Sequence, residues 1–161
     1  VKDWAKNLYN IDNFEHSTFK EGFEKYFIKH YKQSVILYDG VLKVLEFLKD
    51  KNCFIAIATN APQSSLSTVL EKHNILPYFD KALGVSFDIE PKPSPMMLKR
   101  IQAEAKFNKT IFVGDSAKDK LAAQNANIPY IHAKWGEDKC EKDEFTNADE
   151  LIKLIQDFIN L

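Results

Sequence analysis

Five polar side chains in three short segments of the sequence could together hold a phosphate group and a metal ion. They are a hydroxyl, an amide, an ammonium and two carboxylates: Thr59, Asn60, Lys92, Asp115 and Asp119. Hydroxyl and backbone N–H groups at a helix start bind phosphate oxygens, a fixed ammonium meets developing negative charge, and carboxylate oxygens bind Mg²⁺. Each segment also has a purely structural explanation, so their order and spacing matter.

The first segment follows the continuous apolar run Cys53–Ala58, which predicts a strand buried on both faces. The Thr59 hydroxyl and the backbone around Asn60 would leave this strand just before the next helix, where N–H groups bind a phosphate oxygen. Thr and Asn are also common in turns for local hydrogen bonding alone. This segment by itself leaves both explanations open.

Lys92 lies in the segment Glu90–Pro95, where prolines on both sides restrict the backbone. A restricted backbone can hold an ammonium where it meets the negative charge of a transition state. The alternative is a solvated side chain, because all of the 22 basic residues except Arg100 are Lys. With so few guanidinium groups, any anion site here depends on Lys, backbone amides or a metal ion.

Two carboxylates follow the apolar run Thr110–Val113 and begin an alanine-rich helix. Gly114 allows close backbone approach, Asp115 projects from the strand end, and Asp119 follows on the first turn of the helix. Two carboxylates at one strand tip form an oxygen-ligand site that suits Mg²⁺. The structural alternative is helix capping by Asp115 or Ser116, with Asp119 compensating the helix dipole.

The composition excludes several other classes of protein. The 161 residues are 45% apolar and 28% charged, which suits one globular domain with or without a small appendage. A net charge of −1 gives no basic surface for nucleic acid. No apolar run reaches the roughly 18 residues that span a bilayer, and no signal peptide is recognisable. We therefore expect a cytoplasmic protein with neither nucleic-acid nor membrane partners.

The cysteines and histidines show no metal-ligand spacing. Cys53 opens an apolar run and is expected to be a small buried residue. We expect structural or surface roles for the four histidines, which lie far apart in the sequence: His16, His30, His73 and His132.

Helical and strand patterns alternate over most of the chain. Apolar spacing and caps predict helices over 41–48, 64–73, 94–107, 117–126 and 148–161, and apolar runs predict strands over 53–58, 83–87, 110–113 and 129–132. This alternation predicts an α/β fold, a three-layer Rossmann-like parallel sheet with helices on both faces. Such sheets carry their functional residues at the carboxyl ends of the strands. An aromatic helical face over 19–31 needs a separate packing partner.

In this order the three segments resemble motifs of the haloacid dehalogenase-like (HAD) hydrolase superfamily, in particular its phosphoglycolate phosphatase-like branch. Ile55–Asn60 is similar to the second motif of that family, Lys92–Pro95 to the third, and Gly114–Asp119 to the fourth. The turn Tyr38–Val41 is similar to the one that re-enters the core from a helical cap. The resemblance implies a partial helical cap over 1–36 and an α/β core over 37–161.

The first motif of that family, an Asp-x-Asp-x-Thr segment after an apolar strand, does not occur in these 161 residues. In the family its first Asp attacks phosphorus and its second Asp is the general acid and base. The nearest match, Val35–Val41, has Leu37 in place of the nucleophile and lies too close to Thr59 for a cap to intervene. We therefore expect the nucleophile strand, the middle strand of the sheet, to lie before Val1, which would leave this chain incomplete or unstable.

The resemblance implies a Mg²⁺-dependent phosphatase that hydrolyses a small phosphomonoester, a phosphorylated metabolite, through an aspartyl-phosphate. Asp115 would be the direct metal ligand, and Asp119 a second ligand or a residue that orients the first. Thr59 and the Asn60 backbone would hold the phosphoryl oxygens, and Lys92 would neutralise the nucleophile and the transition state.

Two other functions remain open at this point. The paired carboxylates disfavour dehalogenation, which needs no metal ion in this superfamily, but a phosphomutase shares the metal and the aspartyl-phosphate. A non-catalytic HAD-like binding or interaction module is an alternative from another class, since the nucleophile is absent. The sequence predicts neither the substrate nor the oligomeric state.

Overall fold

The computed structural model describes residues 35–105, 107, 109–137 and 141–160. The chain divides into two compact units, Val1–Val35 and Ile36–Leu161. The predicted cap over 1–36, the aromatic face over 19–31, and the residues His16, His30 and Cys140 lie outside the described residues, apart from the last two positions of the cap. The account below concerns the second unit.

Helices and strands alternate along the second unit, as the sequence predicts. The order is α3 (Val41–Asp50), β1 (Ala56–Pro62), α4 (Gln63–Lys72), a short 3₁₀ helix η1 (Leu76–Tyr78), β2 (Lys81–Val85), α5 (Met96–Ala105), β3 (Phe112–Gly114), α6 (Ala117–Ala126), β4 (Tyr130–Ala133), β5 (Glu144–Phe145) and α7 (Ala148–Asn160). Every predicted helix and strand of this unit is present; α6 has the predicted bounds, and the bounds of the others are shifted by a few residues.

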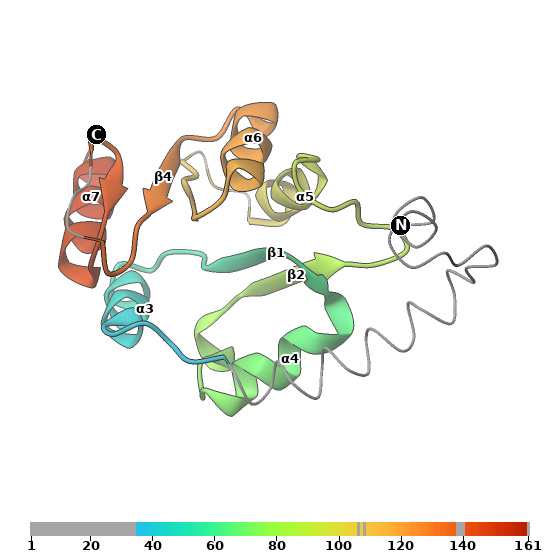
Figure 1. Ribbon diagram of the computed structural model, residues 1–161, viewed down its shortest axis with the longest axis horizontal. Coiled ribbons are helices and arrows are strands. Elements are labelled where there is room, and N and C mark those ends of the chain that lie inside the picture. Colours follow the sequence, from blue (N-terminus) through green and yellow to red (C-terminus); the bar gives the residue numbers. More distant parts are fainter. Residues whose placement is uncertain (1–34, 106, 108, 138–140, 161) are drawn as a thin grey trace, which may run out of the picture. The chain divides into compact units, whose positions relative to one another are not determined.

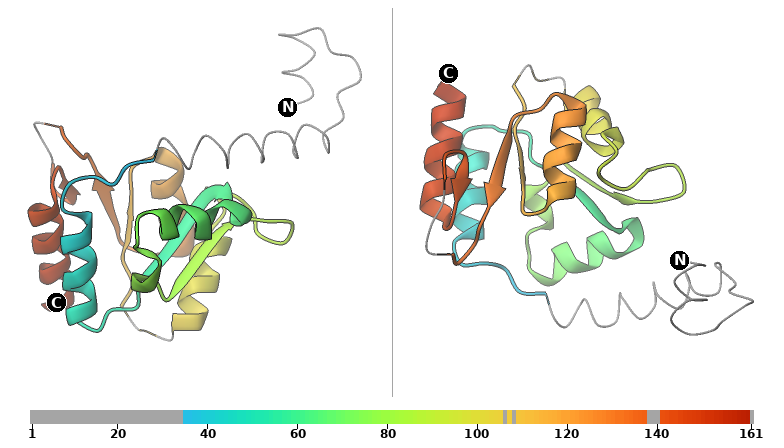
Figure 2. Two further views of the ribbon diagram at one scale, coloured as in Figure 1. Left: turned by 90° about the horizontal axis from the view of Figure 1, so that it is seen from below. Right: turned by 45° about the horizontal axis from the view of Figure 1, so that its top comes forward.

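Every strand ladder in the described part of the chain is parallel, which confirms the predicted α/β class. They form two separate sheets among the described residues, one with the order β1–β2 and one with the order β3–β4–β5. Helices lie on both sides of the strands (Figures 1 and 2). The strands β1 and β2 run side by side with α4 along them, α3 packs against α7, and α5 packs against α6 (Figure 1).

β1 lies further along the chain than the predicted strand over 53–58. The backbone of Ile55 is held at its N–H by the Asp80 carboxylate, 2.8 Å away, and at its carbonyl by the Asp80 N–H, also 2.8 Å away. The ladder with β2 then begins at Ala56 and shifts register before Pro62. Because of this irregularity, Thr59 lies inside the bounds of β1 and not beyond its end.

β5 is an element that the sequence does not predict. It begins at Glu144, at the end of a charged segment that favours a solvated loop, and it is only two residues long. Its second residue, Phe145, is fully buried and packs with Val44, Ile131 and Leu151 in the core between α3, β4 and α7. One large buried side chain is therefore enough to anchor this edge strand.

The core behind the predicted site is apolar and tightly packed. α5 and α6 meet through a cluster of buried side chains, to which β1 and β3 add half-buried ones: Leu98, Ala122, Ala126, Ile128, Ala58 and Phe112. The small alanines allow α6 to lie close to the strands. Within the described residues, none of the helices combines the length and apolar character needed to cross a bilayer.

Candidate active site

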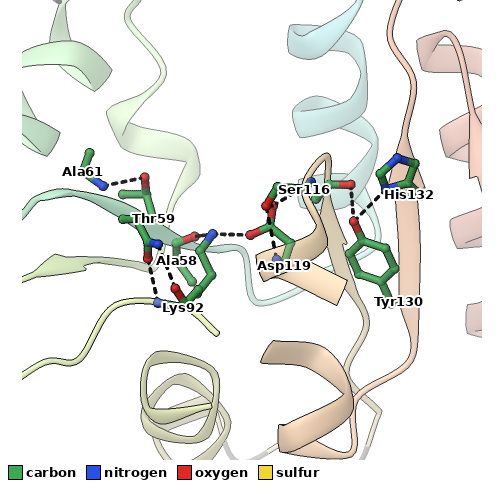
Figure 3. A network of polar contacts seen from close by, with 10 residues as sticks. Ala58, Thr59, Ala61, Lys92, Ser116, Asp119, Tyr130 and His132 are labelled. Atoms are coloured by element: carbon green, nitrogen blue, oxygen red, sulfur yellow. Dashed lines mark hydrogen bonds and ion pairs between the residues drawn. The ribbon is translucent and has the colours of Figure 1, made fainter. Parts of the chain in front are cut away.

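The Lys92 ammonium joins all three of the predicted segments (Figure 3). Its Nζ donates a hydrogen bond to the Ala58 carbonyl at 2.7 Å and lies 2.5 Å from Oδ1 of Asp119. It also lies 5.3 Å from the centre of the Phe112 ring. The side chain is only 11% exposed. The alternative of a solvated lysine is therefore wrong, and the expectation that these segments meet is confirmed.

Asn60 fixes the backbone of Lys92 from the neighbouring strand. Its Oδ1 accepts a hydrogen bond from the Lys92 N–H at 2.7 Å, and its Nδ2 donates to the Lys92 carbonyl at 3.0 Å. The next peptide, Lys92–Pro93, is cis, and the Pro93 carbonyl accepts a hydrogen bond from Asn125. Both polar atoms of the Asn60 side chain are thus engaged, so a contact of this residue with phosphate would come from its backbone.

The Thr59 hydroxyl is half-buried beside the same loop. Its Oγ1 accepts a hydrogen bond from the Ala61 N–H at 3.1 Å, the local turn that Thr commonly makes (Figure 3). A hydroxyl that accepts one hydrogen bond still carries a proton to donate. The expected turn hydrogen bond of Thr59 is therefore present, and it leaves the hydroxyl proton of Thr59 available to a ligand.

Asp119 is held from two directions. In the capping box of α6, its Oδ2 accepts hydrogen bonds from the Ser116 N–H at 3.1 Å and the Ser116 hydroxyl at 2.6 Å, while its own N–H donates to Ser116. Its Oδ1 faces the Lys92 ammonium. Burial raises the pKa of Asp119, but Lys92 and Ser116 outweigh burial and hold the pKa below its ordinary value. The predicted helix cap is confirmed, with Asp119 as its second member.

Asp115 has a different environment, although it precedes Asp119 by only one helical turn. Its side chain is exposed at the carboxyl end of β3 and makes no hydrogen bond or ion pair within the described residues. No group of three or more His, Cys, Asp or Glu side chains there is placed to hold a metal ion. The donor set still fits Mg²⁺, which binds through one or two carboxylates and keeps several waters.

Gly114 makes the approach of α6 to β3 possible. A Cβ atom at this position would lie 2.6 Å from Cβ and 2.7 Å from Cγ of Asp119, which is closer than real atoms approach. Glycine is therefore required here for contact and not for an unusual backbone angle. The predicted close approach at Gly114 is confirmed.

Tyr130 and His132 are residues of this site that the sequence does not reveal. The Tyr130 hydroxyl donates a hydrogen bond to the Gly114 carbonyl at 2.7 Å and lies 2.9 Å from Nδ1 of His132 (Figure 3). Burial, followed by the charges of Asp119, Asp115 and Glu144, raises the pKa of Tyr130 to about 12. A Tyr-x-His spacing on a strand does not predict these contacts, because the Gly114 carbonyl that Tyr130 binds belongs to another strand, β3.

Lys92, Asp115 and Asp119 line a cavity of about 280 Å³, whereas Thr59, Asn60, Tyr130 and His132 are not part of its lining. Its lining comes from the three predicted segments and from Tyr38, Ala133 and Trp135 outside them: Tyr38, Ala58, Lys92, Phe112, Val113, Gly114, Asp115, Asp119, Ala133 and Trp135. The Tyr38 and Trp135 rings are stacked, with their centres 5.2 Å apart, and the Phe145 ring meets Trp135 edge-on at 5.0 Å. The cavity therefore has an acidic side, an ammonium and an aromatic wall.

Comparison with known proteins defines the class to which this fold and site belong. The chain matches the family model of haloacid dehalogenase-like hydrolases over residues 2–133. The chain therefore belongs to the haloacid dehalogenase-like hydrolase family, as the three motifs predict.

Two curated relatives carry a more particular name. Phosphoglycolate phosphatase of Vibrio parahaemolyticus serotype O3:K6 is 31% identical over 143 residues, which are 85% of this chain and 63% of that protein. Phosphoglycolate phosphatase of Rhodobacter capsulatus is 29% identical over 112 residues, 70% of this chain and 51% of that protein. The chain thus spans 51–63% of the length of these relatives.

Solved structures share the fold at lower identity. A predicted phosphoglycolate phosphatase from Haemophilus somnus 129PT superposes with a TM-score of 0.78 at 24% identity, covering 96% of this chain and 74% of that one. A predicted phosphatase from Clostridium acetobutylicum gives a TM-score of 0.75 at 23% identity, covering 98% and 77% of the two chains. These similarities support the α/β core.

Proposed function

We propose that this chain is the larger part of a Mg²⁺-dependent phosphomonoesterase. The observation that carries the proposal is the buried Lys92 ammonium, held between the Ala58 carbonyl and Asp119 at the edge of a cavity. Because Lys92 also lines the cavity, its ammonium can meet the charge of a phosphoryl group there in addition to that of Asp119. The family and the names of the relatives support the same reaction.

Each residue of the site has a role in this proposal. Lys92 neutralises the attacking carboxylate and the phosphoryl oxygens, while Thr59 donates its hydroxyl proton to one of those oxygens. Asp115 is the direct ligand of Mg²⁺, which when bound would balance the charge of the phosphate. Both carboxylate oxygens of Asp119 are already engaged, one by Lys92 and one by Ser116. Asp119 therefore orients Lys92 and caps α6, and it does not bind the metal ion directly.

The attacking carboxylate is proposed to come from a strand between β1 and β3. Among the described residues β1 pairs only with β2, and β3 pairs only with β4. Ala58 of β1 and Phe112 of β3 nevertheless line the same cavity as Lys92. A parallel strand placed there would end beside the ammonium. This supports the expectation of a nucleophile strand outside these 161 residues.

The substrate is proposed to be a small phosphorylated metabolite in the cytoplasm. The cavity is small, and the relatives named phosphoglycolate phosphatase make 2-phosphoglycolate the first compound to test. A phosphomutase would use the same residues, and it is distinguished by returning the phosphoryl group to an organic acceptor instead of water.

The test is a phosphatase assay of the intact polypeptide, including the segment expected before Val1. With p-nitrophenyl phosphate or 2-phosphoglycolate, we expect phosphate release that requires Mg²⁺ and stops with EDTA. Lys92→Ala should lower kcat by about 10²-fold or more, the usual scale for a group that stabilises transition-state charge. Lys99→Ala, which changes an exposed lysine on α5, is the matched control. Full activity in EDTA, or an active Lys92→Ala variant, would contradict the proposal, and a complete lack of turnover would favour the binding module.

A further inference from the structure

The direction of the Asp115 side chain depends on its backbone, because this side chain makes no hydrogen bond or ion pair within the described residues. On the following side, the Ser116 N–H is fixed by Oδ2 of Asp119 at 3.1 Å. On the preceding side, the Gly114 carbonyl accepts the 2.7 Å hydrogen bond from the Tyr130 hydroxyl. Asp115 therefore lies between two anchored peptide groups, and Tyr130 supplies one of the anchors.

Strand register places Tyr130 for this contact. In the parallel ladder, Phe112 pairs with Tyr130 and Gly114 pairs with His132. Tyr130 and His132 are two residues apart on β4, so their side chains share one face of the sheet. The Tyr130 side chain reaches along that face to the end of β3, where the Gly114 carbonyl lies (Figure 3).

His132 determines how the Tyr130 proton is used. A phenol has one proton, and here that proton is donated to the Gly114 carbonyl. The Tyr130 oxygen must then accept from Nδ1 of His132 at 2.9 Å, which requires a proton on that ring nitrogen. A donor on His132 thus directs the Tyr130 hydroxyl toward Gly114.

We propose that Tyr130, directed by His132, is a positioning residue that aims Asp115 at its metal ion. The proposal rests on the phosphomonoesterase function proposed above. Residues behind a metal ligand commonly change metal affinity by 10- to 100-fold without touching the metal. Tyr130 is suited to this role because it holds the peptide group that precedes Asp115, as Asp119 holds the N–H of Ser116 that follows it.

The hydroxyl can be separated from the packing of the ring. The Tyr130 ring lies 6.2 Å from the Phe112 ring and 5.9 Å from the His132 ring, and these contacts survive replacement by Phe. The β3–β4 ladder is made by backbone groups and also survives. Tyr130→Phe therefore removes the anchor on Gly114 and the hydrogen bond with His132, and it keeps the packing of the ring.

The experiment measures Mg²⁺ affinity by calorimetry on the intact polypeptide, together with the melting temperature without metal and the Mg²⁺ dependence of kcat. We expect Tyr130→Phe to weaken Mg²⁺ binding by about tenfold, with kcat largely restored at saturating Mg²⁺. His132→Leu should weaken binding in the same direction. His132→Asn should bind Mg²⁺ more tightly than His132→Leu, with an affinity near that of the wild type, because the Asn amide presents a donor near the place of Nδ1.

The matched control is Tyr78→Phe, a change in η1 within a different apolar cluster, which should leave Mg²⁺ affinity unchanged. Wild-type affinity in Tyr130→Phe would overturn the positioning role while leaving the proposed function intact. Equal losses in His132→Asn and His132→Leu would overturn the part assigned to the His132 donor. If the wild-type polypeptide neither binds Mg²⁺ nor releases phosphate, the proposed function itself fails.

Discussion

Lys92 is the residue whose environment differs most from what its sequence neighbourhood suggests. The prolines beside it indicate a rigid loop, but they do not indicate what the ammonium meets or what holds the backbone. The holding residue is Asn60, which lies 32 positions earlier and was expected to act on phosphate through its backbone. Side-chain partners at such separations are set by the packing of β1 against the loop, and no local pattern encodes them.

The Asn60 clamp leads to a prediction about catalysis. Asn60→Ala removes two hydrogen bonds to the Lys92 backbone, and each is worth about 1 kcal/mol net. We expect kcat to fall by about tenfold with a smaller change in KM, because the Lys92 ammonium remains present but is no longer held in one position. Steady-state kinetics of the intact polypeptide measures this.

Asn125→Ala is the control for that prediction, since it removes a single hydrogen bond to the neighbouring Pro93 carbonyl. A smaller loss is expected there. If both variants lose activity equally, loop rigidity in general and not the Asn60 clamp explains the effect.

At the scale of elements, the helices follow the sequence closely and the strands less so. Helices such as α3 and α7 follow from the apolar spacing of their own residues. Strand bounds depend on a neighbour: β1 begins where β2 pairs with it, and β5 exists because Phe145 is buried against other elements. A two-residue strand has too few positions to show a period.

Asp80 joins two of these elements and predicts a pH dependence of stability. The Ile55 N–H, and to a lesser degree Lys49, lowers the pKa of Asp80 in the folded chain. The unfolded pKa is about 3.9, so the stabilisation is complete above that value and is lost as pH falls through the lower, folded pKa. We expect Asp80→Asn to unfold at lower urea concentration than the wild type near pH 7, with the difference shrinking toward pH 3.

Urea unfolding at several pH values checks this, with Asp157→Asn as the control. Asp157 is exposed on α7, and its side chain makes no hydrogen bond or ion pair among the described residues. Its variant should track the wild type at every pH. A difference between Asp80→Asn and the wild type that stays constant from pH 7 to pH 3 would show that the Asp80 charge is not responsible.

The interruption of the sheet is the feature of the α/β core that bears most directly on function. Parallel sheets are normally continuous and covered on both faces, and unpaired backbone groups inside a protein are costly. Here no ladder joins β1 to β3 in the described part of the chain, although both strands border the cavity that holds Lys92. The motifs predict that the ends of β1 and β3 lie at one site. The absence of the first motif predicts that the strand between them, the nucleophile strand, lies outside these 161 residues.

Hydrogen exchange can test whether a strand belongs between them. We compare the 161-residue chain with a longer polypeptide that adds the segment expected before Val1. If the added segment pairs with both strands, amides of Ala56–Ala58 and Phe112–Gly114 should exchange more slowly in the longer polypeptide, because a second ladder protects them. Amides of α7 donate to carbonyls within the helix, so they should change much less and serve as the internal control. Equal exchange in β1 and β3 of both polypeptides would contradict the proposal that the nucleophile strand lies between them.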